Sequence, residues 1–297
     1  SSDLKSPGES QLTSNGVTAT AIYYYDVTLM EKMANLLGKP DDACKYQDLA
    51  AQIKQAFNQT FWNPSTRTYD RNSQAANAVA LYMELTTSEN RQQVFDNLIA
   101  DIRRRNNALT AGDVGYRYVL RALEAGGASD VIYDMNCKYD TPGYGWQLAH
   151  GATALTESWQ AYGFVSNNHF MLGHLMEWLF SGLGGIRQKE DSFGFKHIVI
   201  KPEPVGDVRD AQVSYKSPYG QIVSDWKDND KEFIIRVEVP ANSKASIYLP
   251  AADTKQITES GVRLEDVPEI NCKQEGNRYV VATTGSGIYT FKVKKNK

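Results

Sequence analysis

The chain has 297 residues, a formal net charge of −3, and 41% hydrophobic and 23% charged residues. This length suits one large or two ordinary domains with a sizeable core, and the charged fraction, near the globular average, excludes wholesale disorder. The net charge argues against a nucleic-acid partner, and no apolar run approaches the roughly 18 residues that span a bilayer.

Three widely spaced cysteines, Cys44, Cys137 and Cys272, argue against a disulfide framework and against a zinc site. Oxygen ligands do not cluster with the spacing of a calcium loop either. We therefore expect no metal and no cofactor.

Residues 1–16 are polar and do not begin with Met. They have the pattern of neither a signal peptide nor a helix, so we expect a disordered segment or the start of a linker. A missing targeting signal says little here about location.

A helical period runs from Val17 to about Gly184. In its first segment Ile22, Tyr25, Leu29, Met33 and Leu36 share one helix face, and Gly38-Lys39-Pro40 ends that helix. Further helices are predicted near 41–57, 73–85, 88–105, 113–125, 129–137, 150–160 and 169–182. Short connections alternate with longer loops at 61–72, 138–149 and 161–168. This alternation favours a toroid of helical hairpins with the longer loops gathered on one face.

After Gly185 the period changes to two, which is typical of strands. Strands are predicted at 197–200, 212–215, 233–239, 245–249, 279–281 and 288–293. They indicate a small antiparallel β-sandwich. We therefore predict a helical domain over 17–188 and a β-sandwich over 189–297.

The segment from Asp140 to Trp178 is the densest in polar, aromatic and glycine residues. Glu157 lies in the predicted helix at 150–160, among small and apolar neighbours and two residues before Trp159. Partial burial there would raise the pKa of its carboxyl group and suit it to proton transfer. A carboxylate in such a place is also commonly a salt-bridged core residue.

Four other side chains allow both a structural and a functional interpretation. Tyr144 and Trp146 offer flat faces that suit sugar rings, but they can equally fill core. His169 can contact substrate or bridge structure. Asp113 follows Gly112 and reads as a helix N-cap, with a role in a binding site as the alternative.

In their order and spacing, several short motifs resemble the inverting α-L-rhamnosidase family of bacterial glycoside hydrolases. They are Gly112-Asp113-Val114-Gly115-Tyr116-Arg117-Tyr118, Pro142-Gly143-Tyr144-Gly145-Trp146-Gln147-Leu148, Gly151-Ala152-Thr153-Ala154-Leu155-Thr156-Glu157-Ser158-Trp159, Asn168-His169 with Gly173, and Glu177-Trp178 with Gly184-Gly185-Ile186. The resemblance covers nearly the whole chain. Ala154, Thr156 and Trp146 depart from the family pattern, and Thr156 could alter the wall beside the site.

The resemblance implies a partial (α/α)6 toroid followed by a C-terminal antiparallel β-sandwich. It implies that Glu157 is the general base and that His169 contacts bound rhamnose. Asn168, Tyr144, Trp146 and Asp113 become candidate contacts to the substrate, a rhamnose-containing oligosaccharide or glycoside.

The family's general acid lies in an upstream stretch that has no counterpart here. About eight helices are readable, whereas a six-hairpin barrel needs about twelve. We therefore expect this chain to be a fragment of a longer polypeptide, with the missing N-terminal part of that polypeptide as its partner. Without that part, apolar helix faces are expected to be exposed.

Two other functions fit the same residues. Another α/α-barrel glycosidase, such as a glucoamylase- or trehalase-like enzyme, also uses paired carboxylates. The chain could also be a non-catalytic carbohydrate-binding module, because its aromatic residues and β-sandwich permit that role.

Overall fold

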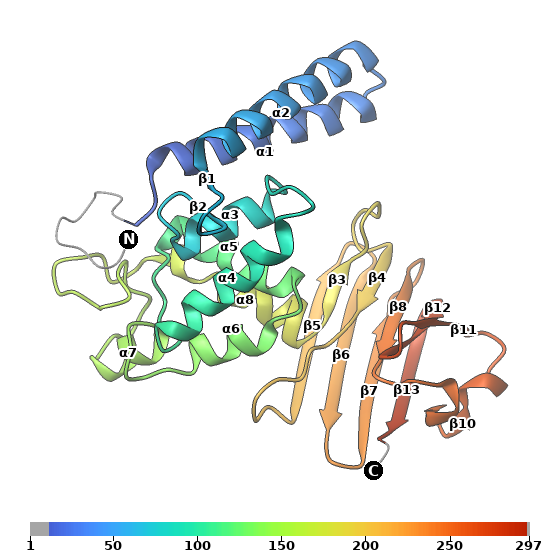
Figure 1. The fold of residues 1–297 in the computed structure, drawn as a ribbon. Helices are drawn as coiled ribbons and strands as arrows, with labels where there is room; N and C mark the ends of the chain where they lie inside the picture. The colour runs from blue at the N-terminus through green and yellow to red at the C-terminus, as the bar shows by residue number, and fades with distance from the viewer. Residues whose placement is uncertain (1–11, 296–297) are drawn as a thin grey trace. The chain divides into compact units, whose positions relative to one another are not determined.

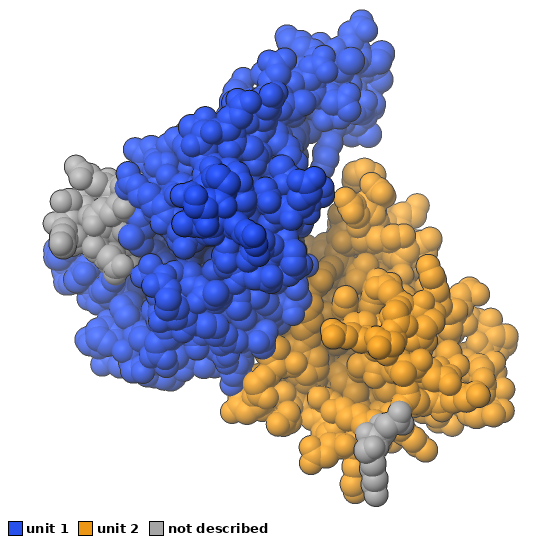
Figure 2. All heavy atoms as spheres, in the orientation of Figure 1, with its two compact units in different colours: residues 1–175 blue, residues 176–297 orange. Residues whose placement is uncertain are grey.

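A computed structural model of the protein describes residues 12–295 (Figure 1). Its contacts divide the chain into two compact units, Ser1–Leu175 and Met176–Lys297, which Figure 2 colours separately. The predicted linker over 1–16 falls mostly on residues 1–11, which lie outside the described residues. The domain limits of 17–188 and 189–297 stay a prediction.

The first unit is built of helices joined by loops, as the helical period predicts. The helices are α1 (Asn15–Leu36), α2 (Pro40–Phe61), α3 (Gln74–Tyr82), α4 (Arg91–Arg104), α5 (Asp113–Ala125), α6 (Ser129–Asn136), α7 (Tyr144–Ala149) and, reaching into the second unit, α8 (Leu175–Trp178). A two-stranded ribbon, β1 (Trp62–Asn63) with β2 (Thr68–Tyr69), follows α2.

The hairpin of α1 and α2 forms where the sequence predicts it (Figure 1). Gly38 takes a positive φ of 66°, and the Lys39 N–H donates to the Ala34 carbonyl at 2.9 Å, which closes the end of α1. Pro40 then occupies the first turn of α2, where its missing N–H costs nothing.

Helix α1 carries apolar residues on two sides. On one side Val27 packs with Ala50 and Ile53 of α2, and the small residues Ala21 and Ala34 are buried as well. The other side is uncovered, with Met33 52% and Leu36 78% exposed. On the face predicted from periodicity, Ile22, Met33 and Leu36 are exposed while Tyr25 and Leu29 are half-buried. Such exposure is expected of a partial barrel.

The predicted helix at 169–182 is divided into three short pieces. They are the 3-10 turn Phe170–Leu172, α8, and a π-helical turn at Leu179–Leu183. Conversely, the loop predicted at 138–149 contains α7, whose six residues are too few to show a helical period.

The second unit consists of two β-sheets, as predicted. The strands are β3 (Ile186–Gln188), β4 (His197–Ile200), β5 (Asp210–Ser217), β6 (Gly220–Asp228), β7 (Glu232–Val239), β8 (Lys244–Leu249), β9 (Ile257–Glu259), β10 (Val262–Arg263), β11 (Asn271–Glu275), β12 (Tyr279–Thr284) and β13 (Gly287–Lys294). One sheet has the order β10-β9-β13-β7-β6-β5 and the other β11-β12-β8-β4-β3.

Pairing in these sheets is antiparallel except between β4 and β8, which run parallel. The core is made by the alternate, inward-facing residues of both sheets, among them Ile198, Ile247 and Phe291. Trp226 lies in the same core and donates its indole N–H to the Leu183 carbonyl at 2.9 Å. Strand β6 is not predicted from periodicity, because Ile222, Val223 and Ser224 are buried in succession and the strand lacks the alternation of period two.

Within residues 12–295, no helix has the length and apolar character to cross a membrane. In the same range, no group of three or more His, Cys, Asp and Glu side chains could hold a metal ion.

Candidate active site

Asp113 and His169 meet at the start of α5. One Asp113 carboxylate oxygen, Oδ1, accepts the Val114 N–H at 2.9 Å, and the other, Oδ2, lies 3.4 Å from His169 Nε2. The two side chains are 44% and 20% exposed, respectively. The N-cap of α5 is Gly112, so the N-cap interpretation of Asp113 is wrong by one residue. The carboxylate still satisfies a first-turn N–H and favours the helix dipole.

An aromatic cluster lies beside this pair. The ring centroids of Tyr116 and Tyr144 are 4.9 and 5.2 Å from that of Trp159, both edge to face. Trp159 is 1% exposed and donates its indole N–H to the Ala111 carbonyl at 2.7 Å. The Tyr144 hydroxyl donates to the Leu172 carbonyl, and burial raises the pKa of this hydroxyl to about 12. The cluster thus ties α5, α7 and the Trp159 segment together.

Helix α7 holds the segment that carries Glu157. Trp146 donates its indole N–H to the Gln160 carbonyl, and buried Gln147 donates its amide to the Ser158 carbonyl, both at 3.3 Å. A Cβ at Gly145 would lie 2.3 Å from the Lys138 carbonyl oxygen, so only glycine lets α7 pack this closely on the preceding backbone.

The helix predicted at 150–160 is wrong, because this stretch is a loop. Gly151 and Ala161 have positive φ angles of 82° and 54°, which no right-handed helix admits. Thr156 Oγ1 donates to the Ser158 carbonyl at 2.6 Å, and Ser158 Oγ accepts the Gln160 N–H at 3.2 Å. These local side-chain bonds replace the helical ladder.

Backbone hydrogen bonds close the loop from Leu155 to His169 at two levels. The His169 N–H donates to the Leu155 carbonyl at 2.8 Å, and the Glu157 N–H donates to the Ser166 carbonyl at 2.9 Å. In return, the Ser166 N–H donates to Glu157 Oε2 at 3.2 Å. One carboxylate oxygen of Glu157 is therefore held by the loop itself.

The Glu157 side chain is exposed, so the expected burial among apolar neighbours is wrong. The residue turns outward because Thr156 and Ser158 on either side take the buried positions. Its carboxylate is accessible to water and to a ligand.

The remaining candidates lie around the same loop. Asn168 is exposed, and its N–H bonds Ser166 Oγ at 3.3 Å. Trp146 stacks on His150 with centroids 4.0 Å apart. Tyr144 and Trp146 thus have packing partners, and contact of either with a sugar stays a prediction.

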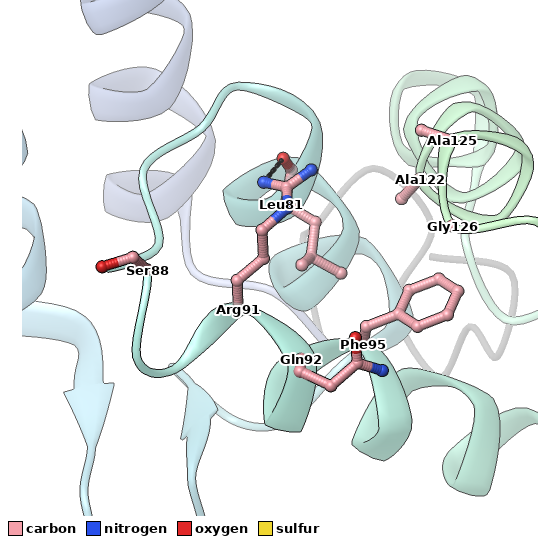
Figure 3. A pocket seen from close by; sticks show the side chains of 8 residues that line it. All are labelled: Leu81, Ser88, Arg91, Gln92, Phe95, Ala122, Ala125 and Gly126. Atoms are coloured by element: carbon pink, nitrogen blue, oxygen red, sulfur yellow. Dashed lines mark hydrogen bonds between the residues drawn. The ribbon is translucent and has the colours of Figure 1, made fainter. Parts of the chain in front are cut away.

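A separate hollow of about 350 Å³ opens where the loop after α3 passes α4 and the end of α5 (Figure 3). Its floor includes Phe95, which packs so closely on Gly126 that an added Cβ would lie 2.1 Å from the ring. Arg91 spans its other side and donates to the Leu81 carbonyl at 3.1 Å. The lining residues are Leu81, Ser88, Arg91, Gln92, Phe95, Ala122, Ala125 and Gly126, none of them a predicted site residue.

Sequence reasoning missed the residues that support the site, above all Gln147 and Tyr116. Both are buried, and the Tyr116 hydroxyl donates to Asn136 Oδ1 at 2.8 Å. Gln147 follows Tyr144 and Trp146 in a glycine-rich stretch, and this pattern is the signal that could have identified it.

Residues 2–183 match the bacterial alpha-L-rhamnosidase 6 hairpin glycosidase domain. The chain belongs to the bacterial α-L-rhamnosidase family. Residues 185–263 match the family's C-terminal domain. The family and the predicted fold class are thereby confirmed.

Among curated relatives, an alpha-L-rhamnosidase of Streptomyces avermitilis is 29% identical over 293 residues, 95% of this chain and 27% of that protein. One from Formosa agariphila is 25% identical over 291 residues, again 95% of this chain and 31% of the relative. The chain therefore spans about a third or less of the length of these relatives.

Solved structures of the family share the fold. The structure of S. avermitilis α-L-rhamnosidase complexed with L-rhamnose matches with a TM-score of 0.84 at 26% identity. The match covers 94% of this chain and 27% of the chain in that structure. The enzyme from Dictyoglumus thermophilum has a TM-score of 0.87 at 30% identity, over 97% and 33% of the two chains.

Proposed function

We propose that this chain is part of an α-L-rhamnosidase that hydrolyses terminal α-L-rhamnosides with inversion, and that Glu157 is its general base. The observation that carries the proposal is the position of Glu157 within the matched glycosidase domain. Its carboxylate is exposed on a loop that is pinned by α7 and by the buried Trp159.

Inversion needs a base that is fixed in place and has room for a water molecule. The Ser166 N–H engages Oε2 of Glu157, which orients the carboxylate and leaves Oε1 to accept a proton. The water oxygen bonds to the anomeric carbon as the bond from that carbon to the leaving oxygen breaks. A carboxylic acid roughly 6.5–9.5 Å from the base protonates the leaving oxygen.

The sugar contacts belong to the same proposal. His169 presents its Nε2 to Asp113, which leaves the other ring nitrogen, Nδ1, for a rhamnose hydroxyl. Asn168 extends the polar edge beside it. Tyr144 and Trp146 contribute an aromatic edge.

The missing acid is assigned to an upstream part of the same polypeptide. Two observations support this: the chain spans 27% and 31% of two curated relatives, and α1 leaves a row of large apolar side chains uncovered. These side chains suit the apolar face of a preceding helical hairpin. They are Ile22, Tyr23, Met30, Met33, Leu36 and Leu37.

The test is Glu157→Gln in the complete enzyme that contains this chain. Loss of the base should lower kcat about 10²- to 10⁴-fold on an aryl α-L-rhamnoside, with little change in KM. Glu89→Gln, which alters an exposed carboxylate in the loop before α4, is the matched control and should leave kcat unchanged. Near-normal turnover by Glu157→Gln would dismiss Glu157 as the base.

A parallel assay distinguishes the proposed rhamnosidase from another α/α-barrel glycosidase. Hydrolysis of an aryl rhamnoside but not of an aryl glucoside supports the rhamnosidase, whereas the reverse preference favours a glucosidase of similar fold.

A further inference from the structure

The tip of the Leu155–His169 loop carries two stacked aromatic side chains. The rings of Tyr162 and Phe164 are nearly parallel, at 9°, with centroids 5.3 Å apart. Phe164 is 69% exposed, whereas Tyr162 is half-buried. Tyr162 therefore covers one face of the Phe164 ring, and solvent covers much of the rest. A single exposed apolar side chain is ordinary, but stacking on Tyr162 gives this ring a defined orientation.

The base of the loop fixes where this ring can lie. Ser166, two residues after Phe164, exchanges hydrogen bonds with Glu157, and the Ala161 N–H bonds the Ser158 carbonyl at 3.0 Å. The Val165 N–H bonds the Tyr162 carbonyl at 3.3 Å, which turns the tip back on itself. The same short loop therefore presents the carboxylate at its base and the aromatic pair at its tip.

We propose that Tyr162 and Phe164 form a stacking platform for the aglycone, the ring attached to the anomeric oxygen of the rhamnoside. The inference rests on the proposed function and adds the residue that determines preference for the leaving group. Ser166, two residues after Phe164, bonds Glu157, so a rhamnoside held beside Glu157 has this ring as a neighbouring apolar surface for the group on its anomeric oxygen. The free face of Phe164 suits an aryl group or the apolar face of a second sugar.

Kinetics of the complete enzyme test the platform. Phe164→Ala should raise KM for p-nitrophenyl α-L-rhamnoside about 2- to 10-fold, which corresponds to about 0.4–1.4 kcal/mol and is the size expected for an aromatic pair. KM for methyl α-L-rhamnoside and the inhibition constant of free rhamnose should not change. Phe164→Tyr keeps the ring and should restore the aryl KM. Phe193→Ala removes a ring that is 76% exposed in the second unit and serves as the control.

The outcomes separate the two proposals. An unchanged aryl KM in Phe164→Ala overturns the platform, as does an equal rise in KM for both glycosides, because the ring would then support the sugar site and not the aglycone. A wild-type enzyme that hydrolyses neither rhamnoside refutes the proposed function itself. Equal melting temperatures of the variants establish that the loop change has not unfolded the protein.

Discussion

At the scale of single residues, Tyr144 and Asp113 each combine a structural contact with a candidate role in substrate binding. Tyr144 is a candidate sugar contact, yet its hydroxyl donates to the Leu172 carbonyl and its ring packs on Trp159. Asp113 is similar, since one oxygen bonds the first turn of α5 and the other faces His169. The structural and functional interpretations of these residues are therefore compatible.

Tyr144→Phe gives a prediction at this scale. Loss of the buried hydrogen bond should cost about 1 kcal/mol of unfolding free energy at pH 8. Burial raises the pKa of Tyr144 to about 12, above its ordinary value of 10. The folded protein thus holds this proton more tightly, and the stability from the neutral hydroxyl is complete below pH 10 and is lost as pH rises through 12.

The difference between wild type and Tyr144→Phe in urea unfolding should therefore shrink between pH 8 and pH 12. Tyr139→Phe alters a tyrosine that is 64% exposed and should match wild type at pH 8. A difference that stays constant with pH would contradict the assignment.

At the scale of elements, the sequence predicts most helices and strands but not every face or boundary. Periodicity identifies the row from Ile22 to Leu36 on α1, yet it cannot say which of two apolar sides meets α2, since the buried side uses alanine and valine. The helix expected at 150–160 fails because Gly151 and the Thr156 and Ser158 hydroxyls act through local geometry, which apolar spacing does not record. Motifs name candidate site residues, whose roles stay a prediction, whereas periodicity and motifs do not single out the supporting residues Gln147 and Tyr116.

The uncovered side of α1 should make the isolated 297-residue chain self-associate. The double variant Met33→Glu with Leu36→Lys places charge on that side and should shift the sedimentation coefficient to that of the monomer. Asn35→Glu adds a charge at an exposed polar position of α1 and should not. Association that survives the double variant would place the contact elsewhere.

At the scale of the whole molecule, this chain carries the proposed general base, Glu157, while its partner acid is proposed to lie upstream. Its helical unit carries Glu157 and the proposed sugar contacts, and its second unit is a β-sandwich with its own core. The helical period before Gly185 and the strand period after it predict a helical part followed by a β-sandwich, whereas the predicted domain limits stay a prediction.

If the general acid lies upstream, as proposed, the isolated chain should hydrolyse aryl α-L-rhamnosides very slowly or not at all, since the leaving oxygen then has no proton donor. A rate assay against the complete enzyme at equal molarity measures this. Robust turnover by the isolated chain that Glu157→Gln abolishes would show instead that an acid lies within these residues.

The parallel pairing of β4 with β8 has a consequence for the order of assembly. In its sheet β4 lies between β3 and β8, and Ile198 is in register with Ala245, far along the chain. During synthesis on a ribosome, β3 and β4 emerge first, and the edge of β4 that pairs with β8 stays unpaired until β8 has been synthesised. Pairing between such distant segments is slow, since the intervening loop must close first. The sandwich therefore completes late, and until then the exposed edge of β4 is where a nascent chain is most open to mispairing with another.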